Sequence, residues 1–140
     1  MNAYQKYRRQ TEVPPPTRID SLLALFDKAL ERLDTAETAL GGGDPATAVA
    51  QLTKAQLIVL ALASGVRVEV NPEVNTCILR LYEFTVQHLR QQTVEGIASA
   101  RQALRTLRDG FEKIRAEANE LERTGQIPPL DRLQMVLATA

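Results

Sequence analysis

The chain has 140 residues and a mass of 15.5 kDa, which is enough for one domain with its own core and too little for two. Lys and Arg total 17, as do Asp and Glu, and the resulting zero net charge argues against sequence-independent binding of nucleic acid. The single cysteine excludes an internal disulfide, and no apolar run approaches the ~18 residues of a membrane span. With a polar, basic N-terminus unlike a signal peptide, the protein is expected to be cytoplasmic.

Residues 1–17 are predicted to form an N-terminal tail. Polar and basic residues surround Tyr4 and Tyr7, and three consecutive prolines, 14–16, favour a stiff extended chain. Thr17 then offers a side-chain oxygen that can cap the first helix.

The first helix is predicted over residues 18–40, because apolar residues recur there at spacings of three and four. Three glycines, 41–43, end it. Leu23 and Leu25 fall outside the narrow stripe, so the helix is apolar on more than one face. The stripe consists of Ile19, Leu22, Phe26, Leu30, Leu33 and Leu40.

The second helix is predicted over residues 45–66, with Asp44 as N-cap and Pro45 in the first helical position. Additional apolar residues, Leu57, Ile58 and Leu60, spread around much of its circumference. Residues 66–70 alternate like a short strand but are interpreted as a connector, since nothing else in the chain could pair with them. The core stripe consists of Ala48, Val49, Leu52, Ala55, Val59, Leu62 and Val66.

Two more helices are predicted over residues 72–92 and 94–123. Asn71 and Pro72 start the third, where Cys77 is expected to be a small core residue. The fourth carries a regular seam of about four heptads and ends before Gly125. The apolar positions are Val74, Ile78, Leu81, Thr85 and Leu89 in the third, and Ile97, Ala100, Leu104, Leu107, Phe111, Ile114, Ala118 and Leu121 in the fourth.

The predicted fold is all-α: an antiparallel four-helix bundle over residues 18–124, with the N-terminal tail and a short amphipathic C-terminal helix. That last segment, 125–140, contains two prolines followed by an apolar face. The face consists of Leu130, Leu133, Val136 and Leu137.

No catalytic, metal or cofactor site is expected. A di-metal bundle needs Glu-x-x-His pairs, whereas the only histidine, His88, follows Glu83 by five residues. Tyr82 and Glu83 are neighbours whose side chains diverge on a helix, so they form no acid–base pair. Arg101, Arg105 and Arg108 share a face, which is interpreted as solvated because the helix also carries as many acids.

The first two helices carry more apolar surface than a four-helix core requires. Two interpretations remain open at this point. Either these helices are the most buried pair, or the bundle has a groove for an amphipathic partner helix.

Several short motifs resemble the flagellar secretion chaperone family FliS, in the family's order over about residues 4–115. Two departures are Lys28, where the family usually has Gly, and Phe111, where it usually has Trp. The segment from Ile127 onward has no counterpart in the family. The motifs are the tail with Tyr4, Gln5 and Tyr7 before 11–17, Leu25-Phe26-Asp27-Lys28-Ala29, Lys54-Ala55 with Ile58, Leu81-Tyr82-Glu83-Phe84 with Leu89, and Leu104, Leu107, Arg108 and Phe111.

The resemblance implies a cytosolic, non-enzymatic chaperone that binds the C-terminal segment of flagellin, blocks premature polymerisation and presents it to the flagellar type III export gate. Such a client is disordered when free and becomes helical on the bundle. The alternative is a helical-bundle adaptor or self-associating structural protein, such as a homodimer, without affinity for flagellin. The residues expected to contact the partner are Tyr4, Tyr7, Leu25, Ile58, Leu62 and Tyr82.

One hypothesis goes beyond the family. The amphipathic segment 128–137 is tethered to the bundle, so it is expected to dock in the client groove and to lower the apparent affinity for the client.

Overall fold

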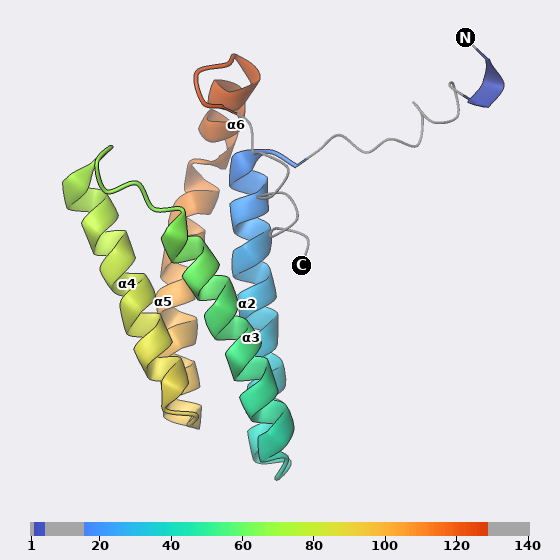
Figure 1. Ribbon diagram of the computed structural model, residues 1–140, viewed down its shortest axis with the longest axis vertical. Coiled ribbons are helices and arrows are strands. Elements are labelled where there is room, and N and C mark those ends of the chain that lie inside the picture. Colours follow the sequence, from blue (N-terminus) through green and yellow to red (C-terminus); the bar gives the residue numbers. More distant parts are fainter. Residues whose placement is uncertain (1, 5–15, 129–140) are drawn as a thin grey trace.

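The computed structural model describes residues 2–4 and 16–128 of the chain. Four long helices run alternately up and down side by side, and a shorter one lies beyond the start of α2 (Figure 1). Neighbouring pairs are α2–α3, α3–α4, α4–α5 and α2–α5, so the helices form a closed square. The predicted all-α bundle is confirmed. The helices are α2 (Arg18–Gly41), α3 (Pro45–Ser64), α4 (Pro72–Arg90), α5 (Val94–Lys113) and α6 (Arg115–Arg123).

Each of the four long helices begins with a side-chain cap. The Thr17 hydroxyl accepts a hydrogen bond from the Asp20 backbone N–H at 3.3 Å, and Asp44 accepts one from Thr47 at 3.2 Å. Asn71 caps α4 and Thr93 caps α5 in the same way. These caps satisfy backbone donors that the first helical turn leaves free, so the sequence sets the starts of the helices locally.

The core is aliphatic, with a short row of aromatic rings near one end. The Phe26 ring packs against Tyr82 and Phe111, with ring centroids 6.2 and 5.8 Å apart. Small residues of the first two long helices, such as Ala29 and Ala55, are fully buried and allow α2 and α3 to approach closely. The other large, fully buried aliphatic side chains are Leu33, Leu52, Val59, Leu89, Ile97 and Leu104.

The structure differs from the prediction of one helix over residues 94–123. The helix breaks at Ile114, whose backbone (φ −100°, ψ 4°) leaves the helical region and which is 48% exposed. Beyond the break, α6 leans over the first turns of α2. The apolar repeat of the sequence continues through the break, so the repeat gives no sign of it. The direction of α6 is instead fixed by its polar contacts with α2.

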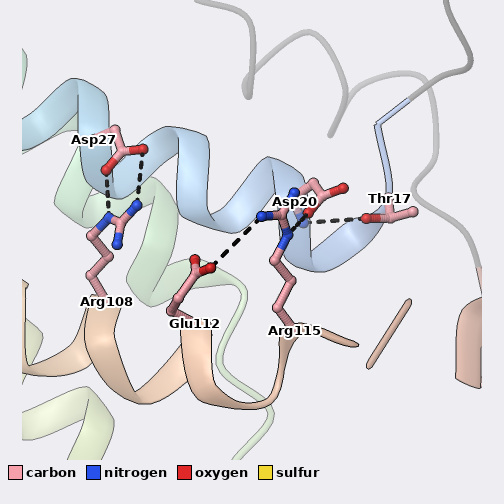
Figure 2. Close-up of polar contacts among 6 residues, drawn as sticks. All are labelled: Thr17, Asp20, Asp27, Arg108, Glu112 and Arg115. Carbon is pink, nitrogen blue, oxygen red and sulfur yellow. Dashed lines mark hydrogen bonds and ion pairs between the residues drawn. The ribbon is translucent and has the colours of Figure 1, made fainter. Parts of the chain in front are cut away.

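Ion pairs join α2 to α5 and α6. Arg108 Nε lies 2.5 Å from Asp27 Oδ1, and Arg115 Nε lies 2.6 Å from Asp20 Oδ1 (Figure 2). Arg101 lies 3.0 Å from Asp34 and also pairs with Glu37. The hydrogen bond with Asp27 raises the pKa of Arg108 above its ordinary value. These arginines therefore hold α5 and α6 against α2.

Besides Ile114, three residues predicted to be in the core are exposed. Cys77 is exposed, contrary to its predicted role as a small core residue, and Val74 and Val49 are also exposed. The buried residues of α4 all lie in its second half, from Tyr82 onward. In its first half, Ile78 is only partly buried against the core, and Asn75 and Ile78 line a cavity at that end of the bundle.

Candidate functional site

An apolar cavity of about 450 Å³ lies at the end of the bundle where α2 begins. It is formed by the first turns of α2, the last turns of α3, the first half of α4 and the junction of α5 with α6. Its volume is within the range of ordinary ligand pockets. Its apolar lining includes Leu22, Leu25, Leu62, Ile78, Tyr82 and Phe111.

The connector between α3 and α4 closes one side of this cavity. Gly65 and Val66 continue from α3 through backbone hydrogen bonds to Leu62 and Ala63. The Asn75 side chain then donates to the Arg67 carbonyl at 2.7 Å, which fastens the connector to the first turn of α4. Arg67 and Val70 therefore line the cavity from the connector.

The cavity floor is aromatic and uncharged. Tyr82 is 1% exposed, and burial raises the pKa of its phenol far above the ordinary value, so the group is neutral at physiological pH. A neutral buried phenol packed against Phe26 contributes shape and apolar surface rather than a base. Ser21 also lines the cavity, and its buried hydroxyl has no hydrogen-bond partner among the described residues.

Polar contacts hold the rim of the cavity between α2 and the end of α6. The Arg18 backbone N–H donates to Glu122 Oε1 at 3.0 Å, and Arg18 Nε donates to the Pro128 carbonyl at 3.1 Å. Ile127 lies between these contacts and lines the cavity. The chain after α6 is thereby held at the cavity rim.

A second apolar surface runs along the outer face of α3. Leu57 and Leu60 are 61% and 52% exposed, and Val49 on the same helix is 41% exposed. By length and hydropathy, α3 is a candidate membrane span within the described residues. Its opposite side, however, supplies Leu52, Val59 and other residues to the bundle core, as expected of a helix that packs in a soluble bundle and carries a further apolar face.

The structure brings together three of the residues that the sequence singled out for partner binding. Leu25, Leu62 and Tyr82 all line the cavity. Ile58 is half-buried against the core, outside the cavity lining. Tyr4 is exposed in the described N-terminal piece, and Tyr7 lies outside the described residues.

Sequence reasoning assigned Phe111 and Ile78 to the core pattern and missed that they line the cavity. Their spacing does not differ from that of buried residues, so periodicity carries no signal for this role. Their role follows only from the tertiary structure, in which α4 and the junction of α5 with α6 border the same cavity.

The described residues contain no group of three or more His, Cys, Asp and Glu side chains placed to share a metal ion. His88 packs its ring against Phe84, with centroids 4.1 Å apart, on the outside of α4. The arginines that share a face of α5 are partly used in ion pairs with α2, through Arg101 and Arg108.

The family model described as flagellar protein FliS matches residues 1–118, which include all of α2 to α5. The match ends within α6, so residues 119–140 lie beyond it. No curated protein and no solved structure matches the chain.

Proposed function

Since this chain belongs to the FliS family of flagellar export chaperones, we propose that it is a cytosolic chaperone for flagellin. It binds the C-terminal segment of flagellin, prevents premature polymerisation and delivers the client to the flagellar type III export apparatus. The proposal involves protein binding without catalysis.

The exposed apolar face of α3 is the observation that supports this proposal best. Val49, Leu57 and Leu60 follow one another at intervals of eight and three residues, so they lie along one side of a 20-residue helix. Such a helix is ~30 Å long, which matches several turns of an amphipathic client helix. A disordered segment that folds along this face would cover apolar surface that the bundle itself leaves in water.

The apolar cavity offers a second contact surface. Leu62 and Leu25 line it near the C-terminal end of α3, so a client that follows α3 reaches the cavity at the end of the same helix. We propose that Leu25, Leu62 and Tyr82 bind one apolar anchor of the client and that Ile58 supports the α3 face. Tyr4 and Tyr7 are proposed to contact the client or the export gate.

The α3 face also supports a second candidate function. A second copy of this chain could cover Leu57 and Leu60, which would make the protein a self-associating adaptor of a secretion system. This candidate requires a stable dimer and no affinity for flagellin.

The experiment is calorimetric titration with a peptide of the last ~40 residues of the host's flagellin, with helix content followed by circular dichroism. Binding with a gain in helicity is the expected result. Leu57→Glu and Leu60→Glu should each weaken binding by at least about ten-fold, because each removes an apolar contact worth ~1.5–3 kcal/mol when fully buried.

Val94→Glu is the matched control, since Val94 is 48% exposed and lies at the start of α5, away from α3. It should leave peptide binding unchanged. Absence of peptide binding together with a dimer that Leu57→Glu dissociates in sedimentation would establish the adaptor instead.

A further inference from the structure

We propose that the C-terminal residues 129–140 dock in the apolar cavity of their own molecule and compete there with the client. The docking itself is independent of what the client is. Its effect on affinity rests on the proposed chaperone function.

The path of the chain after α6 carries the first part of the argument. Gly125 adopts a left-handed backbone conformation (φ 81°), and the backbone N–H groups of Gln126 and Ile127 both donate to the Leu121 carbonyl, at 2.9 and 3.2 Å. The chain therefore turns back on itself at the end of α6. Ile127 enters the cavity lining, and Arg18 holds the Pro128 carbonyl at the rim. The last described residue, Pro128, therefore lies at the rim of the cavity.

The composition of the twelve remaining residues fits what the cavity would accept. Four apolar side chains, Leu130, Leu133, Val136 and Leu137, lie on one side of the helix that their spacing predicts. As a helix the segment would be ~18 Å long, and extended it would reach about twice as far. Both lengths suffice for a cavity whose rim holds Pro128.

The N-terminal tail precedes α2, whose first turns line this cavity, but its composition fits less well. Residues 5–15 contain only Tyr7 and Val13 as large apolar residues, among several charged and polar ones. The cavity lining is mainly apolar, and its charged members are two arginines, Arg18 and Arg67, and one carboxylate, Glu122. It therefore offers the mostly basic tail little compensation for lost hydration.

The docked segment would act as a tethered competitor. A short tether gives roughly millimolar effective concentration, so even weak docking keeps most cavities occupied while a stronger client still displaces the segment. The segment lies beyond the residues that match the family model, so this control would be a property of this chain rather than of the family.

The first test compares Leu133→Asp with Ala138→Asp in the full-length protein by methyl NMR of isoleucine-labelled samples. Both variants place the same charge in the segment, but Ala138 lies opposite the apolar side of the predicted helix. Leu133→Asp should shift the methyl signals of Ile19, Ile78, Ile114 and Ile127, which line the cavity. Ile97, buried elsewhere in the core, is the internal reference.

Unchanged signals for all cavity isoleucines in Leu133→Asp would overturn the proposal. Wild-type signals that move toward those of Leu133→Asp on dilution would overturn it as well, because they would place the segment in a second copy. This test uses no client, so its result stands even if flagellin does not bind.

The second test measures the competition. If the C-terminal segment occupies the cavity in nine molecules of ten, Leu133→Asp should bind the flagellin peptide roughly ten-fold more tightly than wild type. Ala138→Asp should bind the peptide as tightly as wild type does. Equal affinities of Leu133→Asp and wild type, despite shifted methyl signals, would overturn the competition.

Discussion

Two glycines of α5 illustrate how much a single residue depends on its surroundings. Gly96 is buried at the start of α5, where a Cβ atom would collide with the backbone carbonyl oxygen of His88 at the end of α4. Gly110 is exposed near the end of the same helix, and a Cβ atom there would meet nothing within 4 Å. Gly96 thus allows the close approach of α4 and α5, whereas Gly110 has no such role.

The alanine variants should therefore change stability in opposite directions. Gly96→Ala should lower the free energy of unfolding by ~1–3 kcal/mol, because backbone atoms must move apart to admit the new methyl group. Gly110→Ala should raise it by ~0.5–1 kcal/mol, since alanine favours the helix interior. Urea denaturation measures both, and a loss of stability in Gly110→Ala would contradict this account.

At the scale of the element, α6 is defined by what it contacts rather than by its own sequence. In α6, Arg115 pairs with Asp20, and Glu122 accepts a hydrogen bond from the Arg18 backbone N–H. Both partners lie at the N-terminal end of α2. Burial raises the pKa of Asp20, but hydrogen bonds from Arg115, Thr17 and Asn119 outweigh it, so the pKa lies below its ordinary value. The charged form of Asp20 is therefore favoured by folding.

A lowered pKa in the folded state means that the unfolded chain binds the proton more readily. Asp20 should thus contribute stability that is complete above about pH 5 and is lost as the pH falls through about 4 and below. Asp20→Asn should reduce stability at pH 7 by under about 1 kcal/mol, and it should flatten the loss of stability between about pH 5 and 3.

Thermal unfolding from pH 7 to 3 measures this dependence. Glu83→Gln, which removes an exposed carboxylate from α4, is the control and should keep the wild-type slope. An Asp20→Asn slope identical to wild type would show that the contact with α6 does not depend on this charge.

Features with local causes could be predicted from the sequence, whereas features with tertiary causes could not. Thr17, Asp44 and Asn71 act within a few residues, so the helix starts near them could be predicted. The break at Ile114 and the exposure of Cys77 depend on where α6 and α4 lie in the bundle. Periodicity contains no information on either placement.

The same reasoning applies to the site. Leu25 and Tyr82 came from family motifs, and Leu62 came from the core stripe of the second helix. All three line the cavity. Phe111 was also in a motif, but its spacing assigned it to the core seam. Whether an apolar residue lines a cavity or fills a core is decided by its tertiary neighbours, which a single sequence does not contain.

At the scale of the whole molecule, packing is unequal between the two ends of the bundle. The described core residues of α4 start at Tyr82, and α6 contains no buried residue. The end that carries the cavity is consequently less densely packed than the opposite end, where Leu33, Leu52 and Leu89 are fully buried. Weakly packed regions open locally more often than the core does.

Amide hydrogen exchange should reveal this difference. Residues 72–81 and 115–123 should exchange faster than the centres of α2 and α3, because few buried contacts oppose their opening. Addition of the flagellin peptide should slow exchange in residues 72–81, which border the cavity. Equal protection of all helices in the free protein would contradict the unequal packing.

The aromatic row beneath the cavity also gives the molecule a built-in optical probe. The chain contains no tryptophan and three tyrosines, of which Tyr4 is exposed in the tail while Tyr82 is immobilised between the cavity and Phe26. A fixed tyrosine ring in an asymmetric setting produces a near-ultraviolet dichroism signal, which freely rotating rings largely lack. A flagellin peptide chosen without aromatic residues is silent in that band, so the spectrum of the unlabelled protein reports when the cavity fills and empties.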